Sequence, residues 1–139
     1  MATNVYAVQA TLGQPRLAVS AAITEADNGD TVQAVELPAG SWVPPYGVTL
    51  YVAEVFAGGT PSFTIGDGDA VAGWAASSEI TEATVGCYTS VAGAYATNGK
   101  YYGTADTVDV VVDDTTLTGG TAYLLVTYYD LSDADLTAQ

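Results

Sequence analysis

Alternation of apolar and polar residues, broken at short intervals by glycine- and proline-containing turns, limits the fold of this chain more than any other feature. In the segment T-V-D-V-V-V, for example, Val108, Val110 and Val112 fall on one face. A period of two residues is typical of a half-buried β-strand, and no long segment shows the helical period. The sequence therefore predicts an all-β protein.

The spacing of the alternating segments predicts the architecture. We expect about eight to ten strands in an antiparallel β-sandwich of jelly-roll-like type, because short strands at intervals of about 8–12 residues are typical of such folds. One helical turn is expected near 78–82. The predicted strands lie at 6–12, 17–23, 31–37, 48–56, 62–65, 84–89, 94–97, 100–102, 107–112 and 121–131.

Turn residues predict how some strands connect. D-N-G-D at 27–30 and N-G at 98–99 predict β-hairpins, because Asn-Gly accepts the positive φ angles of a type I′ turn. Pro44-Pro45 cannot donate ladder hydrogen bonds and is expected at a sheet edge or corner. In the second predicted strand, Leu17, Val19 and Ile23 are expected to share one face.

A length of 139 residues indicates one domain. We expect a single sandwich over 1–131, with 1–12 as a candidate docking strand or arm, and a polar C-terminal tail over 132–139. Cys87 is the single cysteine, which excludes an intramolecular disulfide and a cysteine-based metal site. The N-terminus lacks signal-peptide features, so synthesis in the cytoplasm of a host cell is expected.

The charge excludes several partners. Arg16 and Lys100 are the basic residues, against sixteen acidic ones, and the formal net charge is −14. Nucleic-acid binding requires a basic surface that displaces counterions, and anionic membranes attract basic segments, so neither partner is expected. Such acidity suits a protein displayed at high density, and it is equally typical of adaptation to a saline environment.

Catalytic chemistry has little support. The chain contains no histidine, which excludes Ser-His-Asp and Cys-His mechanisms, and its single lysine follows a predicted turn. Paired carboxylates of a glycosidase remain conceivable, but most aspartates lie in turns, where their side chains bond to the backbone. We expect no enzyme and no cofactor.

Calcium is the better chemical alternative. Asp67 and Asp69 in G-D-G-D offer clustered oxygen ligands of the kind that Ca²⁺ prefers. They lack the complete calcium-loop motif with a distal glutamate, so they are weak candidates, and a solvated aspartate turn is the preferred explanation.

Several strands are apolar on both faces. In the last strand, Leu124 and Val126 alternate with Tyr123 and Leu125. A monomeric antiparallel sandwich normally exposes one polar face of each sheet, so a second apolar face is expected to be covered by a loop or by another subunit. The sequence therefore predicts an oligomer, with a homotrimer preferred.

Aromatic residues near strand breaks are candidates for contacts with a partner. Trp42, Tyr46, Tyr101 and Tyr102 are the interaction residues we expect, because aromatic side chains are enriched at protein interfaces. The same tyrosines could instead stack on sugars or fill the core, and alternation places one residue of each Tyr-Tyr pair inward.

The middle of the chain resembles a recurring type of small virion protein of tailed phages. The resemblance is carried by L-P-A-G at 37–40, G-V-T-L-Y-V-A-E-V-F at 47–56, F-T-I-G-D-G-D at 63–69 and G-K-Y-Y at 99–102. It implies a head decoration (capsid cement) protein, a β-sandwich trimer bound to the major capsid protein on the capsid surface. The same resemblance allows a head- or tail-fibre domain that binds a host surface glycan, although the chain has no repetitive shaft.

Overall fold

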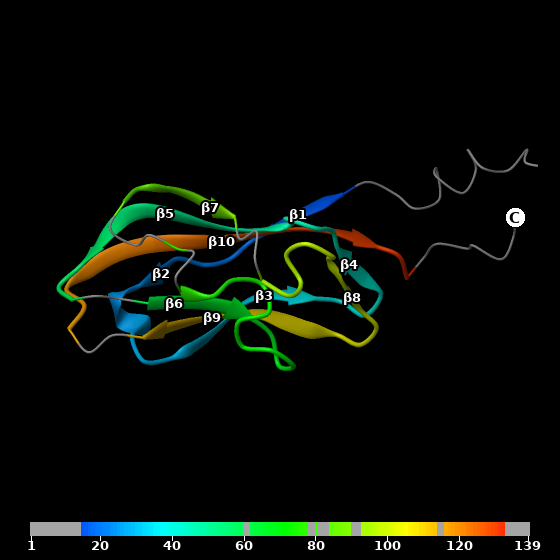
Figure 1. The fold of residues 1–139 in the computed structure, drawn as a ribbon, viewed down its shortest axis with the longest axis horizontal. Coiled ribbons are helices and arrows are strands. Elements are labelled where there is room, and N and C mark those ends of the chain that lie inside the picture. Colours follow the sequence, from blue (N-terminus) through cyan, green and yellow to red (C-terminus); the bar gives the residue numbers. More distant parts are fainter. Residues whose placement is uncertain are drawn as a thin grey trace, which may run out of the picture.

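The computed structural model describes residues 15–59, 62–77, 80, 84–89, 93–113 and 116–132. Two antiparallel β-sheets lie one above the other, as Figure 1 shows, and this arrangement confirms the predicted all-β sandwich. The strands are β1 (Arg16–Val19), β2 (Ile23–Thr24), β3 (Thr31–Leu37), β4 (Ser41–Val43), β5 (Val48–Ala57), β6 (Ser62–Gly66), β7 (Gly86–Thr89), β8 (Lys100–Tyr102), β9 (Asp106–Asp113) and β10 (Gly119–Asp130).

The larger sheet is built around β10. This strand pairs with β5 along one edge and with β1 and β2 along the other, and its C-terminal end pairs with β4. β7 pairs with β5, and β8 pairs with β4. The Pro44-Pro45 turn lies between β4 and β5, two segments that pair with successive parts of β10, so the two prolines occupy the corner predicted for them.

The smaller sheet has the order β3-β9-β6. Its inward side chains include Val108, Val110 and Val112, all fully buried, and they pack with Leu50, Leu124 and other inward residues of the larger sheet in one core. Six of the nine connections between the successive strands β1 to β10 cross from one sheet to the other, as in Greek-key sandwiches. Among the described residues, no helix is long and apolar enough to cross a bilayer.

Both hairpin predictions are wrong. After the D-N-G-D turn, β3 pairs with β9 and not with β2, so the turn carries the chain from one sheet to the other. Asn28 has a φ of −58° and only Gly29 has a positive one, so the turn is not type I′. Residues 94–98 form turns, and β8 after them pairs with β4.

The expected common face of the second predicted strand is also wrong. Ile23 is buried, but Leu17 and Val19 are exposed. Val19 pairs with Leu125, and Ile23 pairs with Ala122. Four residue steps from Val19 to Ile23 therefore lie opposite three steps of β10. The extra residue moves Ile23 to the opposite side of the sheet from Leu17 and Val19. The candidate arm at 1–12 and all but the first residue of the tail at 132–139 lie outside the described residues, as does most of the helical turn expected at 78–82.

Candidate functional site

The outer surface of the larger sheet is the first candidate site. Paired residues share one side of a sheet, so the strand registers define which side chains point away from the core. Nine such residues lie on β1, β10, β5 and β7, and we call them the uncharged face: Leu17, Val19, Thr49, Tyr51, Cys87, Thr89, Tyr123, Leu125 and Thr127.

The uncharged face combines exposure with apolar character. Leu17 is 62% exposed and Tyr51 is 38% exposed. Tyr51 stacks on Tyr123, with ring centroids 6.4 Å apart, and Thr49 hydrogen bonds to Thr89 at 2.7 Å between the two hydroxyls. Neighbouring side chains therefore hold one another in place on a surface that is exposed among the described residues.

Three aromatic rings form a row on the same side of the larger sheet, next to the C-terminal end of β10. Tyr129 pairs with Trp42, and Trp42 pairs with Tyr101 across β10, β4 and β8. The Trp42 and Tyr129 rings have centroids 5.7 Å apart. We call Tyr129, Trp42 and Tyr101 the aromatic row.

The structure separates the four predicted contact residues. Trp42 and Tyr101 lie side by side in the aromatic row, and Tyr101 is 55% exposed. Tyr46 is exposed in the turn between β4 and β5, where it has a φ of +61°. Tyr102 is only 3% exposed and belongs to the core, so its assignment as a surface contact is corrected.

Tyr129 and the Tyr51–Tyr123 stack were not among those predicted contact residues. The sequence did indicate them, because the last strand and the segment at 48–56 are apolar on both faces. That pattern identifies the side of a strand, but it does not reveal which strands lie next to each other. Pairing of β10 with both β5 and β4 brings these rings onto one surface.

A buried ion pair is the second candidate site, and it involves the predicted calcium ligands. Lys100 Nζ donates to Asp67 Oδ2 at 2.7 Å and to Asp69 Oδ2 at 3.1 Å. Tyr102 donates its hydroxyl to the same Asp67 oxygen at 2.9 Å and accepts a bond from Trp74 Nε1 at 3.0 Å. The Asp67 side chain is fully buried.

The second carboxylate oxygen of Asp67 is also satisfied. Asp67 Oδ1 accepts hydrogen bonds from the backbone N–H groups of Asp69 at 2.9 Å and Ala70 at 3.0 Å. These bonds fix the G-D-G-D turn at the end of β6. Lys100, extending from β8, therefore ties the turn to the larger sheet.

The ion pair shifts the pKa values of its members. Burial opposes the charge on Asp67, but the hydrogen bonds from Lys100, Ala70, Tyr102 and Asp69 outweigh it and lower the pKa of Asp67. Burial likewise opposes the charge on Lys100, but its bonds to Asp67 and Asp69 raise the pKa of Lys100. A lysine held in its protonated form has no free electron pair, so this network is unsuited to nucleophilic chemistry.

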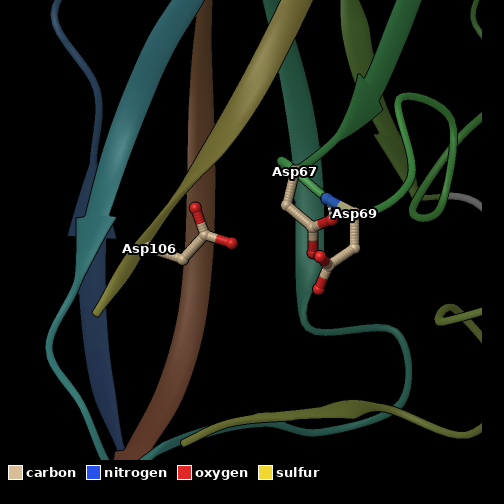
Figure 2. Close-up of side chains that lie close together, drawn as sticks. All are labelled: Asp67, Asp69 and Asp106. Carbon is tan, nitrogen blue, oxygen red and sulfur yellow. Dashed lines mark hydrogen bonds between the residues drawn. The ribbon is translucent and has the colours of Figure 1, made fainter. Parts of the chain in front are cut away.

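Three carboxylates gather beside this network. One oxygen from each of Asp67, Asp69 and Asp106 lies within 4.8 Å of the others, and Figure 2 shows Asp106 facing the other two from β9. The Lys100 ammonium already pairs with both Asp67 and Asp69, so a divalent cation would have to compete with it. The arrangement is that of an ion-pair network, and calcium binding stays a weak sequence-based expectation.

Comparison with known proteins finds similarity in structure. No protein-family model matches the chain, and no curated protein matches its sequence. A chain in the capsid asymmetric unit of cyanophage Pam1 is similar in structure, with a TM-score of 0.63, 19% identity, and coverage of 84% of this chain and 85% of that one.

A second similar chain belongs to the acid-stable capsid structure of Helicobacter pylori bacteriophage KHP30. Its TM-score is 0.64 at 19% identity, and the match covers 84% of this chain and 88% of that one. Both matches extend over most of each chain, so the fold shared is that of the complete sandwich.

Proposed function

We propose that this chain is a virion structural protein that decorates and stabilises the capsid of a tailed phage. The observation that carries the proposal is the likeness of its whole sandwich to chains found in two phage capsid structures. The resemblance of residues 37–69 and 99–102 to head decoration proteins, which rests on the sequence alone, supports the same assignment.

Stabilisation of a capsid needs no catalytic group. A protein that binds only the assembled shell shifts the assembly equilibrium towards that shell by mass action. Its binding surface must be a protein–protein interface, and the aromatic row is suited to one because aromatic side chains with a rigid, amphipathic body are enriched at interface centres.

The proposed partner is the major capsid protein, contacted through Trp42, Tyr46 and Tyr101. These three aromatic residues lie on or beside the β4–β8 pair, where Trp42 packs against Tyr129 and is held in a defined orientation. A preorganised aromatic group loses little conformational freedom on binding. The proposal includes a homotrimer on the outer capsid surface, synthesis in the host cytoplasm, and no role for enzyme activity, nucleic acid or membranes.

The direct test is the composition and structure of purified virions of the phage that encodes this chain. We expect mass spectrometry to find the protein in a fixed ratio to the major capsid protein. We expect a cryo-EM map to show its two-sheet density on the capsid exterior. Absence from virions would overturn the proposal, and density confined to the tail would favour the receptor-binding alternative instead.

A binding assay tests the contact residues. Purified heads that lack this protein should take up the wild-type chain, and the double variant Trp42→Ala/Tyr101→Ala should bind at least about tenfold more weakly, as expected for the loss of interface anchors. The variant Val71→Ala, which shortens an exposed apolar side chain away from the aromatic row, is the matched control. Equal occupancy by all three proteins would place the capsid contact elsewhere.

A further inference from the structure

The turn that follows β4 holds one side chain in an unfavourable backbone conformation. The backbone N–H of Gly47 donates to the Pro44 carbonyl at 3.0 Å, which closes a four-residue turn over P-P-Y-G at 44–47. The ring of Pro45 keeps its φ negative, whereas Tyr46 has a φ of +61°. This combination defines a type II turn, in which the residue with positive φ is normally glycine or asparagine.

Tyr46 is an exception among the residues that the structure describes. Every other described residue with a positive φ is a glycine. In the left-handed region a Cβ lies too close to a carbonyl oxygen of the backbone, so a tyrosine there is strained. Strained residues persist only where the surrounding structure fixes them, and they cluster at sites that bind ligands or partners.

A neighbouring turn fixes Tyr46 in this conformation. The backbone N–H of Tyr46 donates to the carbonyl of the buried Ala96 at 2.9 Å. Gly99 packs so closely on the same turn that a Cβ there would lie 2.6 Å from the Val43 carbonyl oxygen. Val43 pairs with Lys100 in the β4–β8 ladder, so both turns are anchored to the two strands that carry Trp42 and Tyr101.

The tyrosine side chain provides little stabilisation in return for this strain. Tyr46 is 53% exposed. Within the described part of the chain, its ring stacks on no other ring and its hydroxyl makes no hydrogen bond. Glycine or asparagine would form the same turn without strain, so folding alone does not explain a tyrosine at this position.

We propose that this strained turn presents the Tyr46 ring as a preorganised anchor, which enters an apolar pocket on the major capsid protein. The inference rests on the proposed function for the identity of the partner, and it adds that the fold gives up stability for this contact. Aromatic anchors that fill pockets dominate many protein interfaces. A backbone fixed before binding loses little conformational freedom when the ring is bound, which increases affinity.

Paired glycine and alanine variants measure the strain in the absence of capsids. Tyr46→Gly and Tyr46→Ala both remove the ring, but only alanine keeps a Cβ in the left-handed region. We expect the equilibrium constant for unfolding, measured in urea, to be at least about threefold smaller for Tyr46→Gly than for Tyr46→Ala. A Tyr46→Gly variant that is no more stable than Tyr46→Ala overturns the inference.

Val71 provides the matched control pair. It is 63% exposed, similar to Tyr46, and its φ is negative. Val71→Gly should be less stable than Val71→Ala, because glycine loses more conformational freedom on folding and no strain is relieved. The order of the glycine and alanine variants should therefore reverse between the two positions. The same order at both positions overturns the inference.

Binding to purified heads that lack this protein measures the use of the ring. Tyr46→Gly and Tyr46→Ala should both bind at least about tenfold more weakly than wild type, despite their different stabilities, because neither has the ring. Tyr46→Phe keeps the ring and should bind within about threefold of wild type. Weak binding by Tyr46→Phe would show that the hydroxyl is recognised, which overturns the assignment of an apolar pocket.

The proposed function and this inference can fail separately. Heads that take up Tyr46→Gly as well as they take up wild type would overturn the inference and leave decoration intact. A wild-type chain that does not bind heads would overturn the decoration proposal, and with it the partner assigned to Tyr46, whatever the order of stability of the glycine and alanine variants.

Discussion

Asp67 connects three parts of the molecule through one carboxylate. It binds the backbone of its own turn, the Tyr102 hydroxyl of the core and the Lys100 ammonium from the larger sheet. Removal of one member of a buried ion pair leaves the other charge uncompensated, and this penalty exceeds the net stabilisation by the intact pair. The network is therefore expected to respond in a strongly non-additive way to mutation.

A double-mutant cycle measures that coupling. Lys100→Met should lower the free energy of unfolding by about 3 kcal/mol, because the Asp67 charge stays buried without its counterion. Asp67→Asn/Lys100→Met should cost less than the sum of the two single changes by at least about 1 kcal/mol in urea unfolding. Arg16→Met breaks the exposed pair with Asp130 and is the matched control, with an expected loss below about 1 kcal/mol. Additive single effects would contradict the coupling.

The pKa shifts predict how stability depends on pH. The pKa of Asp67 is lowered in the folded state, so the stabilisation by this carboxylate is present above its unfolded pKa of about 3.9 and is lost as pH falls through the folded value. The raised pKa of Lys100 preserves its charge up to at least its unfolded pKa of about 10.4.

The difference in unfolding free energy between wild type and Asp67→Asn should therefore be constant from about pH 5 to pH 9 and shrink as pH falls below about 4. Comparison with the variant cancels the acid response of the other carboxylates, which both proteins share. Urea unfolding at several pH values measures it. A difference that persists unchanged at pH 2 would mean that Asp67 is not stabilised as a carboxylate.

Alternation correctly predicts that only one residue of the Tyr101–Tyr102 pair points inward, but it does not determine which one. The choice follows from pairing of β8 with β4, which places Tyr102 opposite the buried Ser41 and Tyr101 opposite Trp42. The Asp67–Lys100 pair was equally inaccessible to sequence reasoning, because 33 residues separate its members and local turn chemistry explains each one alone.

At the scale of elements, β10 organises the larger sheet, and a register shift near its start shapes the strand. Gly120 has a φ of +130°, and a Cβ at this position would lie 2.3 Å from the Phe56 ring. The pairing of β10 with β5 shifts on both sides of Thr121. Close approach of the backbone to Phe56 therefore requires glycine at this position.

Gly120→Ala should destabilise the protein by about 2–4 kcal/mol, through the clash with Phe56 and the strained positive φ. Gly119→Ala is the matched control, since a Cβ there meets nothing within 4 Å. Its expected effect lies within about 0.5 kcal/mol of wild type. Thermal unfolding of both variants measures the contrast, and equal stabilities would show that β10 relaxes around the added methyl group.

Most strands were predictable from the sequence, but their partners were not. The strand predicted at 94–97 is wrong, since these residues form turns, and β4 was not predicted. The strand expected at 31–37 matches β3, and the strand expected at 107–112 lies within β9, because both show clear alternation. The two hairpins failed because a turn sequence records local backbone preference, whereas β3 and β8 pair with strands distant in sequence. Non-local pairing depends on how whole faces pack, and a turn motif carries no information on that.

At the scale of the whole molecule, the excess of acidic residues opposes the folded state. The formal net charge is −14, and repulsion between carboxylates of one chain destabilises its compact form. Apolar contacts in the core do not depend on charge. Salt screens the repulsion and leaves the core contacts largely unchanged, so it separates the two effects.

Increasing NaCl from about 10 mM to about 500 mM should therefore raise the melting temperature, since the Debye length falls from about 30 Å to below 8 Å. The double variant Glu36→Gln/Asp113→Asn removes two exposed charges of the smaller sheet, and its melting temperature should depend less on salt. Calorimetry across the salt series measures the melting temperature, and a wild-type chain insensitive to salt would show that charge repulsion does not oppose its folding.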